Sequence, residues 1–225
     1  MRNITRNPII SLHIPKCAGT SLKESLQKSL GDNLQLDYGD RVLDISEEAR
    51  IYRIKSKKNS LEKLESIKNK VIIHGHFYGF KYLDIFPESK FVTIIRRPDS
   101  LLLSCYHYLL QRKDDNPLIK LAKKSKTFDD FIEIEEFQNI ITKVSYPLQP
   151  SSFFYIGFFE NYKESLGKYS EITKHKLQEF TRNTNNNKTE ALSIKTLDRI
   201  YYLNQKDFLF YAEACKLFWN TKFNQ

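Results

Sequence analysis

The 225-residue chain is long enough to bury a substantial core, and we expect a single domain over residues 1–225. A hydrophobic content of 40%, with only seven glycines and seven prolines, excludes a low-complexity chain. The formal net charge of +9 favours an anionic partner, such as a phosphorylated cofactor, an acidic glycan, nucleic acid or a membrane surface, although a solvated lysine-rich surface would give the same charge.

Cysteine usage and hydropathy bear on the compartment. Cys17, Cys105 and Cys215 are odd in number and widely spaced, which excludes a disulfide framework and fits a reducing compartment. No apolar stretch approaches the roughly 18 residues that span a bilayer, and "PIISLHI" is too short for a signal peptide. We expect a cytoplasmic protein without a membrane span, or a Golgi-lumen one if an anchor was trimmed.

The first predicted elements are a strand and a helix. Residues 8–14 form a short apolar run, which predicts a strand. A helix follows, with Thr20 or Ser21 as its cap and Gly31 at its end. Its apolar residues recur at four-residue steps and should pack against the core: Leu22, Leu26 and Leu30.

Apolar runs then alternate with helical patterns along the chain. Further strands are predicted at 34–38, 70–74, 90–95 and 152–160. Further helices are predicted at 61–67, 98–110, 127–141, 161–169 and 205–219. The last helix carries a stripe that we interpret as core, made of Phe208, Tyr211, Ala212, Cys215 and Phe218. The alternation predicts an α/β fold, a parallel sheet with helices on both faces.

In such sheets ligands bind at the carboxyl ends of the strands, and three predicted strand ends carry polar clusters. The first cluster, residues 16–21, puts backbone N–H groups at a helix start beside Lys16, an arrangement that favours an anion. Gly19 would let the backbone approach that anion closely. An ordinary capped turn is the alternative interpretation.

The order of residues in this turn narrows its chemistry. A nucleotide triphosphatase loop places its lysine after the second glycine, whereas Lys16 precedes Gly19. A cysteine phosphatase loop would pair Cys17 with an arginine six residues later, where Lys23 stands instead. Both activities are therefore disfavoured.

The second cluster, "HGHF", sets His74 and His76 on the same side of a strand end. One imidazole could be a general base that the other orients, or both could simply be core residues. No cysteine or carboxylate has the spacing that would complete a zinc site, so we expect no metal.

The third cluster follows the strand at 90–95. Arg96 at the strand end and Ser104 two helical turns later could converge on a phosphate, which an arginine fork binds bidentately. Arg97 is either a second phosphate contact or a solvated side chain.

These motifs carry a family resemblance. "HIPKCAGTSL" resembles the 5′-phosphosulfate signature of Golgi-type carbohydrate sulfotransferases, and "FVTIIRRPDSLLLSCYHY" resembles their 3′-phosphate signature. "HGHF" between them is similar to the heparan sulfate 2-O-sulfotransferase and uronyl sulfotransferase branch. "FFYIGFFENYKESL" and "DFLFYAEACKLF" resemble later segments of the superfamily, whereas residues 32–69 and 111–150 carry no such signature.

The resemblance implies a P-loop-like sulfotransferase fold and sulfuryl transfer from 3′-phosphoadenosine-5′-phosphosulfate (PAPS), without a metal. In that scheme His76 is the base, Lys16 stabilises the leaving oxygen, and His74 orients the acceptor or assists. The loop around 182–189 would close over the nucleotide. The implied cofactor-binding residues are Lys16, Cys17, Ala18, Gly19, Thr20, Ser21, Arg96 and Ser104.

Three residues depart from the family pattern. Arg97 replaces an aspartate and Leu101 a second arginine, which weakens the expected grip on the 3′-phosphate unless Arg97 compensates. Cys17 replaces a hydroxyl residue, although the backbone contacts should survive. The expected acceptor is a hydroxyl, preferably on a carbohydrate, with a lipid, a small molecule or a peptide tyrosine as alternatives, and not nucleic acid. The alternative function is a non-catalytic protein that binds adenosine bisphosphate or an anionic glycan.

Overall fold

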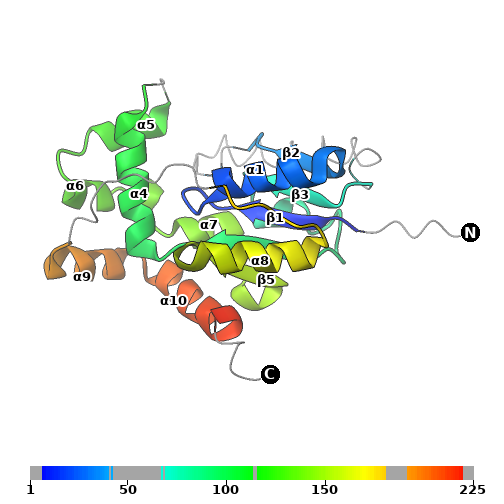
Figure 1. The fold of residues 1–225 in the computed structure, drawn as a ribbon. Helices are drawn as coiled ribbons and strands as arrows, with labels where there is room; N and C mark the ends of the chain where they lie inside the picture. Colours follow the sequence, from blue (N-terminus) through cyan, green and yellow to red (C-terminus); the bar gives the residue numbers. More distant parts are fainter. Residues whose placement is uncertain are drawn as a thin grey trace, which may run out of the picture.

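A computed structural model of the chain describes residues 7–40, 42, 67, 69–113, 116–180 and 192–219. It contains a five-stranded sheet with the order β2-β3-β1-β4-β5, in which every neighbouring pair is parallel. The strands are β1 (Ile9–His13), β2 (Leu34–Asp37), β3 (Ile72–Gly75), β4 (Phe91–Ile95) and β5 (Tyr155–Phe158). The predicted parallel α/β architecture is therefore confirmed (Figure 1).

The strand order places a point of divergence beside the central strand, where successive connections leave the sheet in opposite directions. From β1 the chain first builds β2 and β3 on one side, and only then crosses to β4 and β5 on the other. The connections that leave β1 and β4 therefore diverge at the carboxyl edge of the sheet, which is where ligands bind in open parallel sheets. The loop after β1 and the residues after β4 are the first and third polar clusters of the sequence.

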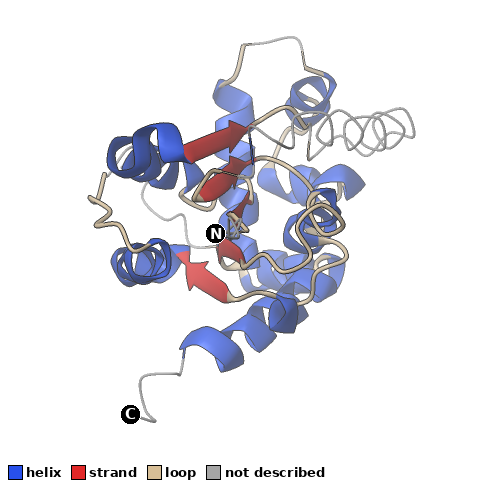
Figure 2. Ribbon diagram, turned by 90° about the vertical axis from the view of Figure 1, so that its right-hand side faces the viewer, coloured by secondary structure: helices blue, strands red, loops and turns tan. Residues whose placement is uncertain are grey.

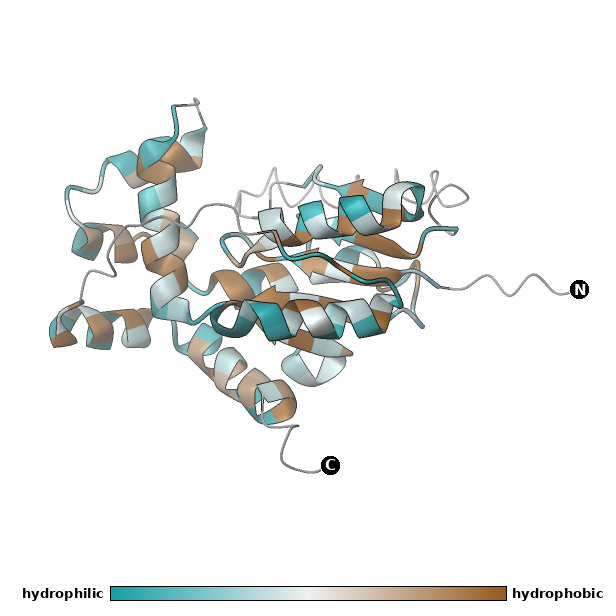
Figure 3. Ribbon diagram, viewed as in Figure 1, coloured by the Kyte–Doolittle hydropathy of each residue, from teal (hydrophilic) through white to brown (hydrophobic). Residues whose placement is uncertain are grey.

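Two helices cover one face of the sheet. They are α1 (Gly19–Leu30) and α8 (Tyr162–Thr173), and Figure 2 shows them on the opposite side of the strands from the other helices. In Figure 3 their outward surface is largely hydrophilic. The predicted leucine stripe of α1 is confirmed: Leu22, Leu26 and Leu30 are buried. They share one hydrophobic cluster with Ile9, Ile72 and Val92 of the sheet.

The second face is covered by helices of the chain's later part. Its core joins Ile10, Leu12 and Ile95 of the sheet to α4, α7 and α10, and extends to the smaller helices beyond the carboxyl edge. The helices are α4 (Pro98–Gln111), α5 (Pro117–Lys123), α6 (Phe128–Ile132), α7 (Ile140–Ser145), α9 (Ile194–Leu203) and α10 (Gln205–Ala214). Short 3-10 turns occupy Gly31–Asn33, Gly79–Lys81, Glu135–Phe137, Pro150–Ser152 and Phe159–Asn161, and a π-helical turn covers Cys215–Trp219.

Some local predictions were wrong. The expected helix at 127–141 is broken into α6, a 3-10 turn and the start of α7. The backbone is extended at Ile134, and Asn139, just before α7, adopts a left-handed conformation with φ of 52°. Helix α1 begins after Ala18, which caps it through a left-handed backbone and not through a Thr20 or Ser21 side chain. Of the C-terminal stripe only Ala212 is exposed, whereas the others are partly buried against the core: Phe208, Tyr211, Cys215 and Phe218. The fully buried apolar residues of α10 are Phe210 and Ala214.

The remaining expectations concern an edge strand and two segments that lie mostly or wholly outside the described residues. The segment at 34–38 is confirmed as a strand, β2, at the edge of the sheet. The helix predicted at 61–67 lies outside the described residues except for Ile67, and the loop at 182–189 lies outside them entirely. Within the described residues, every helix is too short or too polar to cross a lipid bilayer.

Candidate active site

The loop between β1 and α1 has the backbone of an anion-binding turn. Lys16 and Ala18 adopt left-handed conformations with φ of 63° and 61°, and the Cys17 N–H donates to the Ile14 carbonyl at 3.3 Å. Alternation of left-handed with ordinary residues is how backbone N–H groups gather into a concave nest. The first N–H groups of α1 have no partner within the helix, so the loop offers donors to a ligand.

Position 19 requires a glycine for a packing reason that the sequence did not reveal. A Cβ atom at this position would lie 1.6 Å from Nε2 of His13. The glycine therefore makes room for an imidazole against the first turn of α1, in addition to any close approach of an anion.

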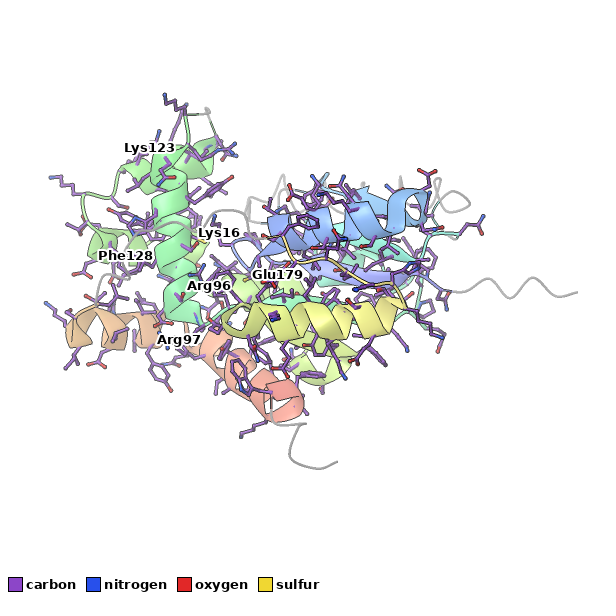
Figure 4. All side chains as sticks on the ribbon, viewed as in Figure 1. Lys16, Arg96, Arg97, Lys123, Phe128 and Glu179 are labelled. Carbon is purple, nitrogen blue, oxygen red and sulfur yellow. The ribbon has the colours of Figure 1, made fainter. Side chains whose placement is uncertain are left out.

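Lys16 lies between the loop and helix α4. Its Nζ is 4.0 Å from the centroid of the Tyr108 ring, a cation–π distance. Burial lowers the pKa of Lys16, and the nearby guanidinium of Arg96 lowers it further. Figure 4 places Lys16 and Arg96 on the side of α4 that faces the sheet.

Arg96 joins the end of β4 to the loop. Its Nε donates to Ser100 Oγ at 2.8 Å, its Nη1 donates to the Lys16 carbonyl at 3.4 Å, and its guanidinium lies 4.1 Å from the Phe159 ring centroid. Burial lowers the pKa of Arg96, yet a guanidinium stays charged in proteins. Within the described part of the chain no carboxylate forms an ion pair with it, so its charge is available to an anion.

Ser104 lies on the same face of α4 as the groups that touch the loop. Ser100, which binds Arg96, precedes it by one turn, and Tyr108, which contacts Lys16, follows it by one turn. The structure thus brings Arg96 to the loop, and helical spacing puts Ser104 on the face of α4 that carries the groups in contact with Arg96 and Lys16.

Arg97 is engaged elsewhere. Its Nε and Nη2 donate to both carboxylate oxygens of Asp99 at 2.7 and 2.8 Å, and its backbone N–H donates to Glu160. The hydrogen bond to Asp99 is the main reason that the pKa of Arg97 is raised. Leu101, at the place of the family's second arginine, is buried in the core.

His76 has its tautomer set by the backbone. Its Nδ1 lies 2.8 Å from the His13 carbonyl, and because a carbonyl only accepts, Nδ1 carries the hydrogen and Nε2 keeps its lone pair. Burial lowers the pKa of His76, which makes the neutral form dominant at neutral pH. A neutral imidazole with a lone pair on Nε2 is ready to accept a proton.

His74 is fully buried. Its Nδ1 lies 2.9 Å from Ser11 Oγ, and its Nε2 has no hydrogen-bond partner among the described residues. Burial lowers the pKa of His74 to about 3. With no exposed surface, His74 has no direct route to an acceptor, so any contribution passes through its neighbours.

Two further residues, which the sequence did not single out, complete this cluster. The His13 ring stacks on His76 with centroids 3.9 Å apart and lies 5.4 Å from His74. Its Nδ1 is 3.1 Å from the Tyr38 hydroxyl, and the Tyr38 ring stands edge-on to His76 at 5.0 Å. Lys23 Nζ lies 5.0 Å from the Tyr38 ring centroid. The one signal in the sequence that could have marked Tyr38 as a site residue is its position at the end of a predicted strand.

The remaining chemistry of the cluster is restricted. The imidazole planes are nearly parallel, at 12° and 22° to His13, and no group of three metal-binding side chains occurs within the described ranges.

Cys17 is buried, and burial raises the pKa of its thiol well above the ordinary value. A protonated buried thiol is a poor nucleophile, unlike the thiolate of a cysteine phosphatase.

Comparisons with known proteins bear on the fold. No family model and no curated protein matches the sequence. A sulfotransferase from Alicyclobacillus acidocaldarius aligns with a TM-score of 0.54 and 13% identity over 94% of this chain and 95% of its own. Mouse sulfotransferase SULT7A1, solved with PAP, aligns with a TM-score of 0.46 and 14% identity over 89% of this chain and 64% of its own. The likeness to the bacterial protein shows that the chain has the sulfotransferase fold.

Proposed function

We propose that this protein transfers the sulfuryl group of PAPS to an acceptor hydroxyl. The observation that carries the proposal is the meeting of Lys16 and Arg96 at the loop after β1, where the carboxyl ends of β1 and β4 lie side by side. The loop residues match a phosphosulfate signature, and the imidazole that could act as base is anchored to the strand that begins the loop.

The residues present fit the donor's two charged ends. Backbone N–H groups at Ala18–Ser21, together with Lys16, suit the 5′-phosphosulfate. Arg96, already oriented by Ser100 and without an ion pair to any described carboxylate, suits the 3′-phosphate together with Ser104. The Arg97 ion pair with Asp99 argues that Arg97 does not replace the family's second arginine.

Lys16 would act on the leaving group. As the bond between sulfur and the bridging oxygen breaks, its electron pair remains on that oxygen, which becomes a phosphate oxygen of adenosine 3′,5′-bisphosphate. An ammonium placed there stabilises the developing charge more than it stabilises the ground state. The left-handed backbone at Lys16 and the hydrogen bond from Arg96 to its carbonyl fix the base of this side chain.

His76 would act on the acceptor. Nε2 accepts the hydroxyl proton while the acceptor oxygen forms its bond to sulfur, in line with the leaving oxygen. The His13 carbonyl holds the hydrogen on Nδ1, so the resulting imidazolium keeps a hydrogen-bond acceptor. The His74 ring stacks on the other side of the cluster against His13, and Ser11 holds it there through a hydrogen bond. We therefore assign His74 a positioning role in the proposed mechanism.

We further propose a carbohydrate acceptor, of the kind used by the uronyl branch that the sequence resembles. The support is the character of the surface next to the base. The Tyr38 ring offers an apolar wall beside His76, and Lys23 adds a positive charge that suits an acidic sugar.

Mass spectrometry tests the proposal. The protein is incubated with PAPS and a panel of glycans, and sulfated products are sought beside a sample in which adenosine 3′,5′-bisphosphate replaces PAPS. We expect sulfate on a glycan only with PAPS. Tight binding of the nucleotide with no sulfated product from any hydroxyl acceptor would favour the non-catalytic binding protein instead.

A further inference from the structure

We propose that Tyr108 is a positioning residue for Lys16, and that its aromatic ring keeps the ammonium group beside the loop both before and after the donor binds. The inference rests on the proposed sulfuryl transfer. Neither the signature motifs nor the fold assigns a role to Tyr108, and the contact joins the loop after β1 to helix α4, 92 positions apart by the numbers of the two residues.

The geometry of the contact supports this role. Lys16 Nζ lies 4.0 Å from the Tyr108 ring centroid, within the range where a ring face attracts a cation. The ring has a polar partner as well, because Arg112 Nη1 donates to the Tyr108 hydroxyl at 3.0 Å, and 40% of the residue is exposed. Lys16 is thereby held at both ends, by Arg96 at its carbonyl and by the ring at its ammonium.

The electrostatics explain why a ring is needed here. Lys16 and Arg96 bring two positive charges together at the loop, and their repulsion disfavours this arrangement before an anion arrives. Each of the two cations lies over an aromatic ring. Lys16 lies on Tyr108, which the Arg112 guanidinium also approaches at 5.5 Å, and Arg96 lies on Phe159. The negative ring faces offset part of the repulsion without introducing a carboxylate that would compete with the donor.

A cation–π contact is also weak enough not to compete with the donor. An anionic phosphosulfate attracts the ammonium more strongly than a ring face does, so the ammonium can bind the donor while the ring still restricts the side chain from the other side. Without the ring, the flexible lysine side chain would sample many positions, and the fraction placed for catalysis would fall.

Substitution of Tyr108 measures the effect. Tyr108→Leu should lower kcat by about 2- to 30-fold, with little change in affinity for adenosine 3′,5′-bisphosphate, whereas Tyr108→Phe, which keeps the ring, should restore most of the rate. In a Lys16→Ala background the Tyr108→Leu change should have no further effect. Tyr202→Leu is the matched control, because Tyr202 on α9 contacts Arg199 in the same way and lies 65% exposed.

A nuclear magnetic resonance measurement tests the contact independently of activity. The ring current of Tyr108 should shift the ε-methylene protons of Lys16 upfield in the wild type and in Tyr108→Phe, but not in Tyr108→Leu. Identical shifts in all three proteins, or a Tyr108→Leu protein with the wild-type rate, would overturn the proposal. If the wild type shows the shift but transfers no sulfate, the fault lies in the proposed function and the positioning role falls with it.

Discussion

His76 owes its readiness to accept a proton to one carbonyl group. The His13 carbonyl fixes the hydrogen on Nδ1, and burial keeps the ring neutral. In the proposed mechanism, an alanine at position 76 removes the acceptor for the proton but leaves the Lys16 loop and Arg96 in place. The two properties, catalysis and donor binding, should therefore separate in variants of His76.

We predict that His76→Ala lowers turnover by roughly 10²–10⁴-fold, while the rise in melting temperature caused by adenosine 3′,5′-bisphosphate stays near that of the wild type. Steady-state rates and thermal melts check the two halves. A variant that has lost both activity and the nucleotide-induced rise would instead identify His76 as a structural residue.

The sequence indicated part of this site because some of its signals are local. Lys16 and Arg96 follow strands directly, and the carboxyl ends of parallel strands share one edge of a sheet. Ser100 and Tyr108 lie on a predicted helix, but their partners come from other segments. Contacts between residues far apart in sequence are set by the packing of helices and strands, which no short motif encodes.

At the scale of elements, the start of α7 depends on a carboxylate from α10. Asp207 is buried and accepts from the backbone N–H groups of Ile141 and Thr142 at 2.9 and 2.8 Å, and from the Thr142 hydroxyl at 2.6 Å. Just before α7, the Asn139 backbone N–H donates to the Asn204 side-chain oxygen, and the Asn139 side-chain amide donates to the Leu203 carbonyl. The helix predicted at 127–141 breaks at this point because distant side chains satisfy the backbone there, which a local pattern cannot reveal.

We predict that Asp207→Ala lowers the free energy of unfolding by about 1–3 kcal/mol, because it leaves buried donors of α7 without an acceptor. Asp198→Ala on α9, where the aspartate is exposed, is the matched control and should change stability by less than about 0.5 kcal/mol. Urea unfolding of the three proteins measures both. Equal losses in the two variants would argue against the capping role.

For the whole molecule, the parallel sheet was predictable because its strands are short apolar runs separated by helical patterns. The order of the strands was not, since it depends on how α1 and α8 pack together on one face. That order places buried histidines at the centre of the sheet, where charge is costly. The stability of the fold should therefore depend on pH.

The pKa of His74 is about 3 in the folded protein and near 6.5 when unfolded, so below pH 6.5 the unfolded chain binds more protons. The stabilisation that comes from keeping His74 neutral is complete above pH 6.5 and is lost as the pH falls toward 3. At pH 5 the loss amounts to about 2 kcal/mol. We predict that His74→Asn, which can still bond Ser11, reduces the loss of stability between pH 7 and pH 5 by that amount. Denaturant unfolding at both pH values measures it, and equal losses in the two proteins would contradict the account.

The central claim is that sulfuryl transfer occurs at the loop after β1 and depends on the ammonium of Lys16, not on the neighbouring thiol. The most direct measurement is the rate of transfer from PAPS to one acceptor by Lys16→Ala and by Cys17→Ser, with thermal melts to confirm folding. We predict a loss of about 10²–10³-fold for Lys16→Ala, because the leaving oxygen loses its preorganised charge, and most of the wild-type rate for Cys17→Ser, whose parent thiol is buried and protonated. A nearly normal Lys16→Ala beside an inactive, folded Cys17→Ser would contradict the account.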